Sequence, residues 1–284
     1  MDQLRPSATP PLWSRAAGIA AFCALLVLSQ FGPAAAEDKP AGCTPPPEEV
    51  TVDPTPPINI GILANALTYY RCTKYDADVT AALATARAWV AKRAAEVAKP
   101  AIVLDIDETS LSNWEEIFRN NFGYIPHGAC DLNVQSACGQ HDWELSARAV
   151  AIEPTLELFN FAQTLKGKNG EPVDIYFITG RFEDPVERAA TEWNLRKVGY
   201  DKWRQLFMRD ASKNFKNVSI YKTWARTQIE ADHIIIANVG DQLSDLVGNQ
   251  SGDHAERCFK VPNPFYFIAG EPVPTGGLKC MTTQ

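Results

Sequence analysis

The sequence predicts an α/β protein with a central parallel β-sheet that helices cover on both faces. Short apolar runs over 101–104, 173–178 and 233–239 have the length and the β-branched content of buried strands. Longer stretches with apolar residues at helical spacing lie between these runs. Because strand and helix alternate along the chain, the strands are expected to run parallel.

The first 36 residues are predicted to be a secretory signal peptide rather than part of this fold. Arg5 and Arg15 precede an apolar run over 16–28, and the small residues that follow suit cleavage near Ala36. The run is short for a membrane span, which argues against a retained anchor. We therefore expect a secreted or periplasmic protein with no membrane attachment after cleavage.

Removal of this leader leaves six cysteines, an even number that suits an oxidising compartment. Sequence alone does not fix their connectivity. The short separations favour three pairs: Cys130 with Cys138, Cys258 with Cys280 and, from what remains, Cys43 with Cys72. A zinc site is the competing use, but the chain has no CxxC pair and its four histidines are scattered in sequence.

The chain is acidic, with a formal net charge of −7 at pH 7, and the mature form would be one unit more negative. Its sequence contains no basic run. These features argue against a nucleic-acid polymer or an anionic membrane as the main partner. A small phosphorylated substrate would depend on local cations instead.

The N-terminal part of the mature chain is predicted to be a proline-rich arm over 37–58, followed by one domain over 59–284. Two helices are expected at the start of this domain, over 60–73 and 77–97. Pro100 ends the second helix and leads into the first strand. The oligomeric state cannot be inferred from the sequence.

An irregular segment over about 110–150 separates the first strand from the next helix. It is rich in aromatic residues and contains two of the six cysteines. Inserted at this point, the segment is expected to fold over the site as a small cap. Trp114 is a candidate for stacking on a nucleobase or aryl group, with plain core packing as the alternative.

The rest of the chain is predicted to alternate between helix and strand. Helices are expected over 155–165, 185–198 and 222–231. Strands are expected over 173–178, 206–208, 233–239 and 258–261. Gly199 ends the second of these helices, as a C-cap glycine does.

Polar residues follow three of the predicted strands, at the edge where an open parallel sheet binds its ligands. They are, strand by strand, Asp105 with Asp107, Thr179 with Gly180, and Asp241 with Asp245; Lys222 precedes the last of these strands. Two carboxylates as close as the first pair repel each other unless a cation lies nearby. The pattern predicts a Mg²⁺-dependent phosphate site with the first aspartate as nucleophile.

Each of these groups has a simpler interpretation when taken alone. Asp and Thr after a strand can cap a helix, and so can Asp241 and Asp245. The residues from Thr179 to Arg181 can simply form a turn between a strand and a helix. Lys222 can be a solvated helix residue, with Lys213 and Lys216 as competitors for its role. The simpler interpretations would require four coincidences in order.

The four groups resemble, in order and rough spacing, the four motifs of the haloacid dehalogenase (HAD) superfamily. The matching residues read DIDET from 105, TGR from 179, Lys222 and GDQLSD from 240. Within the superfamily the chain resembles the secreted four-aspartate acid phosphatases of class B or subfamily IIIB type, a group similar to plant acid phosphatases and vegetative storage proteins. The sequence FKVPNP from 259 is similar to the C-terminal pattern of that group.

This resemblance covers about residues 60–270. It implies a HAD-like Rossmannoid three-layer sandwich with a central parallel sheet and a small cap. Asp105 would be the nucleophile that becomes aspartyl phosphate. Asp107 would protonate the leaving oxygen and then take a proton from the hydrolytic water.

The resemblance also implies which residues bind phosphate and metal. Thr179 and the Gly180 amide would hold phosphoryl oxygens, and Lys222 would balance the charge between nucleophile and phosphate. The Mg²⁺ ligands would be Asp105, Asp107 through its backbone carbonyl, Asp241, and Asp245 as a ligand or a supporting partner. Arg181, for which the phosphate and a carboxylate are alternative partners, is left outside the catalytic set, and Glu108 has no predicted role.

We therefore expect a secreted Mg²⁺-dependent acid phosphatase that hydrolyses small phosphomonoesters, with nucleotides among the candidate substrates. One alternative is a non-catalytic storage or binding protein on the same fold. Another is a phosphotransferase, which would use the same residues to pass phosphate to an alcohol other than water.

Overall fold

The computed structural model describes residues 40–43, 48–51, 58–134, 136–246, 253–268 and 280. The predicted signal peptide, most of the predicted proline-rich arm and most of the C-terminal tail lie outside these residues. The predicted division of the chain therefore stays a prediction. In the part of the chain that is described, no helix combines the length and the apolar character needed to cross a membrane.

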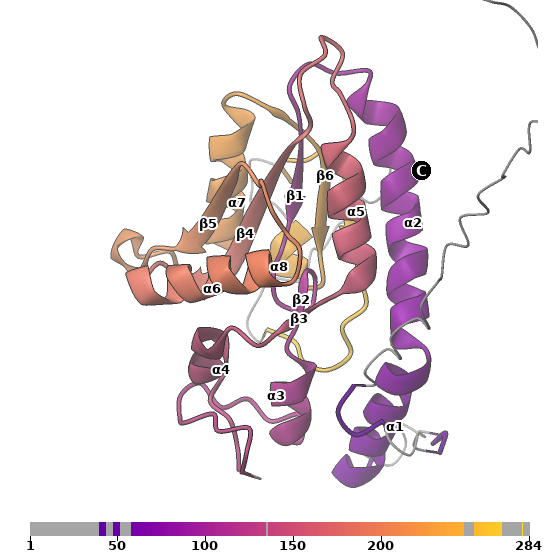
Figure 1. Ribbon diagram of the computed structural model, residues 1–284, viewed down its shortest axis with the longest axis vertical. Coiled ribbons are helices and arrows are strands. Elements are labelled where there is room, and N and C mark those ends of the chain that lie inside the picture. The colour runs from indigo at the N-terminus through magenta and orange to yellow at the C-terminus, as the bar shows by residue number, and fades with distance from the viewer. Residues whose placement is uncertain are drawn as a thin grey trace, which may run out of the picture. The chain divides into compact units, whose positions relative to one another are not determined.

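Five parallel strands form the central sheet, in the order β5-β4-β1-β6-β7 (Figure 1). They are β1 (Pro100–Leu104), β4 (Asp174–Phe182), β5 (Gln205–Arg209), β6 (Ile234–Gly240) and β7 (Cys258–Lys260). The first strand of the sheet in sequence thus lies at its centre, between β4 and β6. The residues that follow these three strands consequently meet at one edge.

Helices cover both faces of the sheet, as predicted (Figure 1). The longer helices are α1 (Ile60–Thr73), α2 (Tyr75–Ala94), α5 (Glu153–Gln163), α6 (Pro185–Lys197) and α7 (Val218–Glu230). Ile102 and Leu104 of β1 pack in the cluster that contains α2 and α5, whereas Ala101 and Val103 pack in the cluster that contains α7. Burial on both faces explains why this strand is apolar throughout.

Some element bounds differ from the prediction for local reasons. The helix α7 begins at Val218, four residues early, because the Asn217 side chain caps it by accepting a hydrogen bond of 2.9 Å from the Ile220 amide. The strand β4 continues to Phe182 because its end pairs with Arg209 of β5. The residues Thr179, Gly180 and Arg181 therefore lie in the strand, not after it.

The segment between β1 and α5 begins and ends in a two-stranded antiparallel ribbon formed by β2 (Leu111–Ser112) and β3 (Val150–Ala151). We call the residues between these strands, 113–149, the insertion. It contains two short helices, α3 (Trp114–Arg119) and α4 (Gln140–Ser146). Because β2 and β3 pair, the insertion leaves and re-enters the core at one place.

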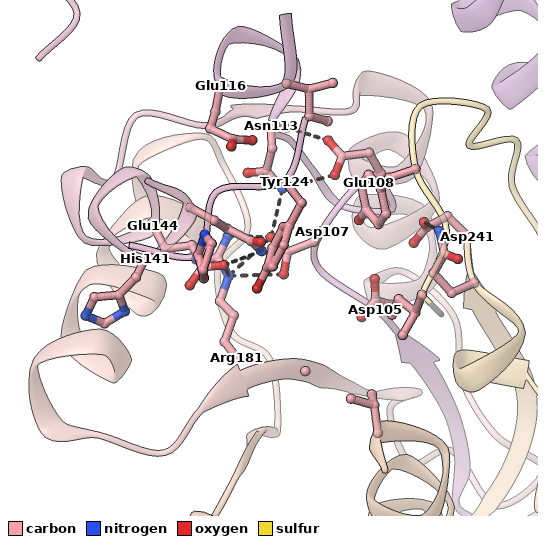
Figure 2. A pocket seen from close by; sticks show the side chains of 18 of the residues that line it. Asp105, Asp107, Glu108, Asn113, Glu116, Tyr124, His141, Glu144, Arg181 and Asp241 are labelled. Carbon is pink, nitrogen blue, oxygen red and sulfur yellow. Dashed lines mark hydrogen bonds and ion pairs between the residues drawn. The ribbon is translucent and has the colours of Figure 1, made fainter. Parts of the chain in front are cut away.

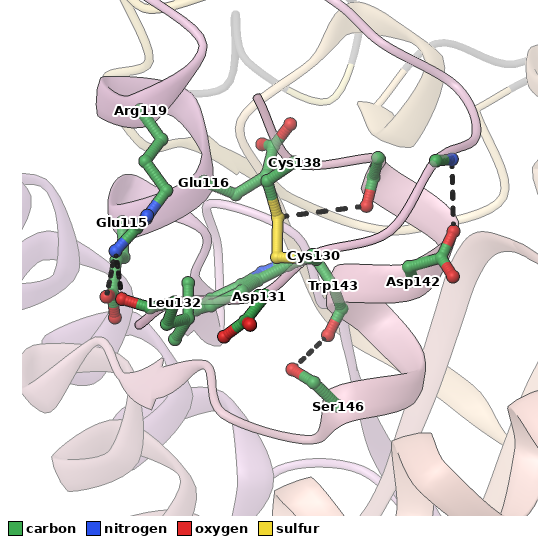
Figure 3. Close-up of a disulfide and its surroundings, with 12 residues drawn as sticks. Glu115, Glu116, Arg119, Cys130, Asp131, Leu132, Cys138, Asp142, Trp143 and Ser146 are labelled. Carbon is green, nitrogen blue, oxygen red and sulfur yellow. Dashed lines mark hydrogen bonds and ion pairs between the residues drawn. A yellow bond between two sulfur atoms is a disulfide. The ribbon is translucent and has the colours of Figure 1, made fainter. Parts of the chain in front are cut away.

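All three predicted disulfides are present, and they join Cys43 to Cys72, Cys130 to Cys138 and Cys258 to Cys280. The second one ties the loop between α3 and α4 (Figure 3). Asn120 Oδ1 accepts a hydrogen bond of 2.8 Å from the Cys138 amide in this loop. The two-helix insertion has few residues with which to build a core. A covalent link inside it is therefore a stabilising substitute.

Candidate active site

A cavity of about 720 Å³ opens at the carboxyl edge of the sheet (Figure 2). Its walls come from the ends of β1, β4 and β6, from the insertion, and from residues 265–268 after β7. Six of the seven predicted site residues line it: Asp105, Asp107, Gly180, Lys222, Asp241 and Asp245. The seventh, Thr179, is fully buried beside it, with its hydroxyl 3.4 Å from the Asp107 carboxylate.

Asp105 lies directly after β1 and is held by the Lys222 ammonium. Its amide donates to the Val239 carbonyl, which extends the pairing of β1 with β6 by one residue. Lys222 Nζ lies 2.5 Å from Asp105 Oδ1 and 2.5 Å from Asp245 Oδ1. Lys213 instead lies over the Trp224 ring, so the structure brings Lys222, and not this competitor, to the site.

Burial and the neighbouring acids set the protonation of this pair. Burial alone would lower the pKa of Lys222, but Asp105 and Asp245 outweigh it and hold that pKa above its ordinary value. Burial and then the Asp245 charge raise the pKa of Asp105 well above its ordinary value, against the opposing effect of Lys222. One ammonium therefore does not neutralise this group of acids.

Asp105, Asp241 and Asp245 form an acidic cluster in which one carboxylate oxygen of each lies within 4.8 Å of the others. Three donors fix the Asp241 carboxylate: Thr109 Oγ1 at 3.0 Å, and the side-chain amides of Gln242 and Asn263 at 2.7 Å each. Burial and the Asp245 charge raise the pKa of Asp241 to about 6. Buried carboxylates in excess of their cation are a donor set that fits a hard divalent ion.

The glycine of the last motif is required by close approach of the Asp245 side chain. A Cβ at position 240 would lie 2.2 Å from Asp245 Cβ. The short helix α8 (Leu243–Leu246) carries Asp245 back over the end of β6, where its Oδ2 accepts the Gln242 amide at 2.8 Å. The Asp245 carboxylate thus reaches Lys222 only because residue 240 has no side chain.

Asp107 has a different cation from Asp105. This cation is Arg181, which the sequence leaves outside the predicted catalytic set, with a carboxylate or the phosphate as its alternative partner. Arg181 is buried at the end of β4, with Nη2 2.7 Å from Asp107 Oδ1 and Nε 3.2 Å from both Asp107 oxygens (Figure 2). Burial would raise the pKa of Asp107, but Arg181 and a hydrogen bond from Asn113 hold it below its ordinary value. A strand that continues through 182 places residues 179 and 181 on one face, which is the signal that identifies Arg181.

Glu108, for which no role was predicted, positions Asn113. It has a backbone φ of 53°, and its carboxylate accepts from the Asn113 amide at 2.5 Å and from Asn113 Nδ2 at 3.1 Å. Asn113 Nδ2 also lies 2.9 Å from Asp107 Oδ1. Burial and the Asp107 charge raise the pKa of Glu108 to about 8.

Trp114 lies inside the insertion and not on the cavity wall. Its indole Nε1 donates to the Ala41 carbonyl at 2.9 Å, and its ring contacts Phe118, Phe122 and Phe265. The structure therefore favours core packing over the predicted stacking on substrate. The aromatic side chains that line the cavity are Phe122, Tyr124, Phe182, Phe265, Tyr266 and Phe267.

Comparison with known sequences identifies relatives of this chain. A family model described as HAD superfamily, subfamily IIIB (acid phosphatase), matches residues 57–269. The chain is 33% identical over 172 residues to a stem 28 kDa glycoprotein of Glycine max, covering 60% of this chain and 61% of that protein. It is 30% identical over 167 residues to acid phosphatase 1 of Solanum lycopersicum, covering 58% of each.

The chain is 36% identical over 169 residues to vegetative storage protein 1 of Arabidopsis thaliana, covering 58% of this chain and 54% of that protein. The matches thus span between about half and three fifths of the length of these curated relatives. The fold is similar to the solved structure of the class C acid phosphatase from Bacillus anthracis. That match has a TM-score of 0.53 and 25% sequence identity, and it covers 70% of this chain and 82% of the other.

The family match covers most of the chain and includes every strand of the sheet, the acidic cluster and its lysine. It agrees with the resemblance of the four sequence motifs and with the observed α/β architecture. The chain belongs to the HAD superfamily, subfamily IIIB (acid phosphatase).

Proposed function

We propose that this chain is a secreted, Mg²⁺-dependent acid phosphatase that hydrolyses small phosphomonoesters through a phospho-aspartyl intermediate on Asp105. The observation that carries the proposal is the position of this carboxylate. It lies 2.5 Å from the Lys222 ammonium, inside an acidic cluster, in a cavity at the carboxyl edge of the sheet. The insertion is proposed to be the small cap over that cavity.

The acidic cluster of Asp105, Asp241 and Asp245 would hold Mg²⁺, with the Asp107 carbonyl as a further ligand. Carboxylate and carbonyl oxygens are the hard donors that Mg²⁺ prefers, and this ion usually keeps several of its waters. When bound, Mg²⁺ would neutralise charge on the phosphoryl oxygens. The three donors on Asp241 leave its carboxylate in a fixed orientation for this purpose.

The protein groups divide the two steps of the reaction between them. An Asp105 oxygen forms a bond to phosphorus while the bond between phosphorus and the leaving oxygen breaks, and Asp107 gives its proton to that oxygen. Water next attacks the phosphorus of the aspartyl phosphate, its proton passes to Asp107, and the Asp105 carboxylate is released with inorganic phosphate. Thr179 and the Gly180 amide would hold phosphoryl oxygens.

Arg181 is proposed as a positioning residue for Asp107. Its two-nitrogen contact fixes the carboxylate plane and lowers the pKa, so the protonated form of Asp107 is populated mainly at acid pH. An acid that must protonate a leaving group works only while it holds a proton. This contact therefore restricts proton donation by Asp107 to acid pH.

A broad range of small phosphomonoesters, nucleotides included, is the substrate class that the cavity supports. Its volume of about 720 Å³ lies within the range of small-molecule sites. Tyr124 and Phe267, exposed by 75% and 79%, line the cavity and offer apolar surface to an aryl or nucleoside group. The acidic sequence, which has no basic run, argues against nucleic-acid polymers as substrates.

Secretion to the periplasm or the outside of the cell is proposed from the predicted leader together with the disulfides. Three disulfides join the six described cysteines, and such bonds persist in oxidising compartments.

The test is hydrolysis of an aryl phosphate by the oxidised mature chain, with Mg²⁺ and with chelator, beside an Asp105→Asn variant. We expect turnover that requires Mg²⁺ and disappears in the variant. Absence of turnover from acid to neutral pH in a folded sample would favour the storage or binding alternative. Product analysis with an added alcohol separates hydrolysis from phosphotransfer.

A further inference from the structure

A second group of side chains that could hold a metal ion lines the same cavity, and His141 and Glu144 of this group lie across Arg181 from Asp105 and Asp241 in the view of Figure 2. It consists of His141 and Glu144 on α4 and Glu187 on α6, and one ligand atom of each lies within 4.8 Å of the others. His141 Nδ1 is 3.6 Å from Glu187 Oε2. Two ligands of a tetrahedral ion with bonds of about 2.0–2.2 Å are separated by a similar distance, roughly 3.3–3.6 Å.

The two carboxylates are held in place by other contacts that leave an oxygen for a ligand. Glu187 Oε1 accepts the Phe182 amide at 2.9 Å, so that Oε2 faces His141. Glu144 Oε1 accepts from Gln140 Nε2 at 2.9 Å. The carboxylate side chains are only 3% and 8% exposed, whereas His141 is 39% exposed and gives access from the cavity.

The imidazole of His127 lies near that of His141. The His127 and His141 rings are 5.7 Å apart between centroids, and both residues line the cavity. The insertion thus brings together two histidines that are 14 positions apart in sequence. His127 is one candidate for the fourth ligand, and a water molecule is the other.

The charge around this group is unbalanced. Arg181 faces it, but Arg181 Nη2 and Nε bind Asp107, and Nη1 donates to Thr191 Oγ1 at 3.1 Å. Glu144 Oε1 remains 4.0 Å from Arg181 Nε. One guanidinium therefore faces the carboxylates of Asp107, Glu144 and Glu187, and at these buried positions all three would be charged together only beside a further cation.

We propose that His141, Glu144 and Glu187 form a Zn²⁺ site that is separate from the acidic cluster. Imidazole together with carboxylate is a donor set that suits Zn²⁺, whereas carboxylates alone suit Mg²⁺. Because α4 belongs to the insertion and α6 to the core, an ion at this position would link the two across the cavity wall. The proposal does not depend on phosphatase activity.

The test is a calorimetric Zn²⁺ titration of the untagged, oxidised, metal-free mature chain, in Mg²⁺ that saturates the acidic cluster. We expect one Zn²⁺ per chain, with affinity at least about tenfold lower in His141→Ala and in Glu187→Gln. Both variants are expected to fold, because His141 is part-exposed and glutamine keeps an oxygen to accept the Phe182 amide. Zn²⁺ at about a hundred times its dissociation constant should raise Tm by roughly 5–10 °C.

Asp241→Asn is the matched control, because it alters the acidic cluster and should leave this Zn²⁺ binding in place. Co²⁺ in place of Zn²⁺ should give the strong visible absorption of a tetrahedral ion in the unaltered chain and not in His141→Ala. The proposal is overturned if Zn²⁺ binds equally well to His141→Ala and Glu187→Gln, or if Asp241→Asn alone abolishes binding. Absence of Zn²⁺ binding also overturns it, and a proton shared between Glu144 and Glu187 then balances the charge.

Discussion

Asp105 and Asp107 are two residues apart in sequence, yet they lie in different halves of the cavity. Asp105 is buried beside Lys222 and two further aspartates, and burial and the aspartate charges raise its pKa well above the ordinary value against the opposing effect of Lys222. Asp107 faces Arg181 and Asn113, which hold its pKa below the ordinary value. The cause is topological: β1 lies between β6 and β4, so one carboxylate meets side chains around β6 and the other meets the end of β4. Two chemically identical side chains thus differ in pKa and in role because their neighbours differ.

The largest expected effect comes from removing the two carboxylates in turn. Asp105→Asn should lower kcat for an aryl phosphate by about 10⁴-fold or more, because no other group can form the aspartyl phosphate. Asp107→Asn is the matched variant. It should still form that intermediate from an aryl phosphate, whose leaving group needs little protonation, and rapid acid quenching should detect phosphoenzyme. Comparable residual turnover in both variants would contradict the division of roles.

The cations that serve the two halves should differ in their response to Mg²⁺. Lys222→Met leaves Asp105 and Asp245 buried without their ammonium, at a cost of about 3–5 kcal/mol in the free energy of unfolding without metal. Mg²⁺ should restore part of this loss, because it would bind the same carboxylates. Arg181→Met should also be destabilised, but Mg²⁺ should restore little of its free energy of unfolding. Urea unfolding of both variants, with and without Mg²⁺, measures these changes. Equal rescue of the two variants would argue against a metal confined to the Asp105 half.

Arg181 also sets the pH range in which Asp107 can donate a proton. Arg181→Gln removes the charge that lowers the Asp107 pKa, so the protonated form persists to higher pH. The alkaline limb of the pH–kcat profile should move to higher pH, although kcat itself falls as the carboxylate loses its orientation. Arg181→Lys keeps the charge and should move the limb less. If the alkaline limb does not move in Arg181→Gln, the limb does not report the titration of Asp107.

The smallest effect concerns Glu116 on α3. Burial raises the pKa of this side chain from its ordinary value of 4.5 to about 7. The folded state binds this proton more tightly than the unfolded state. The resulting stability is present below pH 4.5 and is lost as pH rises through 7. Glu116→Gln should therefore gain about 1–2 kcal/mol over the unaltered chain at pH 8 and little at pH 4.5. Denaturant unfolding at the two pH values measures it, and an equal change at both would contradict the shift.

The sheet, the disulfides and the convergence of the strand-end residues could all be predicted from the sequence. Buried parallel strands are apolar throughout, and their carboxyl ends share an edge, so strand order along the chain was enough to place Asp105, Thr179 and Asp241 together. The sequence leaves the partner of Arg181 open between the phosphate and a carboxylate, because the position of this side chain depends on where β4 ends, and pairing with β5 fixes that end. Element ends set by such contacts leave little trace in local sequence.

The insertion was harder to predict for a similar reason. Its helices have six and seven residues, too few to show a helical pattern. Trp114 is buried by Ala41 and Phe265, which lie far from it along the chain. Glu108 acts through a backbone with positive φ and through Asn113. None of these neighbours can be identified from spacing alone.

The paired strands β2 and β3 make the two ends of the insertion leave and re-enter the core at one place. Ser112 pairs with Val150 there. Asn113, the first residue of the insertion, is held from the core by Glu108 and from the insertion by Trp143, whose indole donates to Asn113 Oδ1 at 2.8 Å. Asn113 in turn binds Asp107. A mutation in the insertion that displaces Trp143 therefore reaches the Asp107 carboxylate as well as the cavity wall, so specificity and catalysis evolve together through this one asparagine.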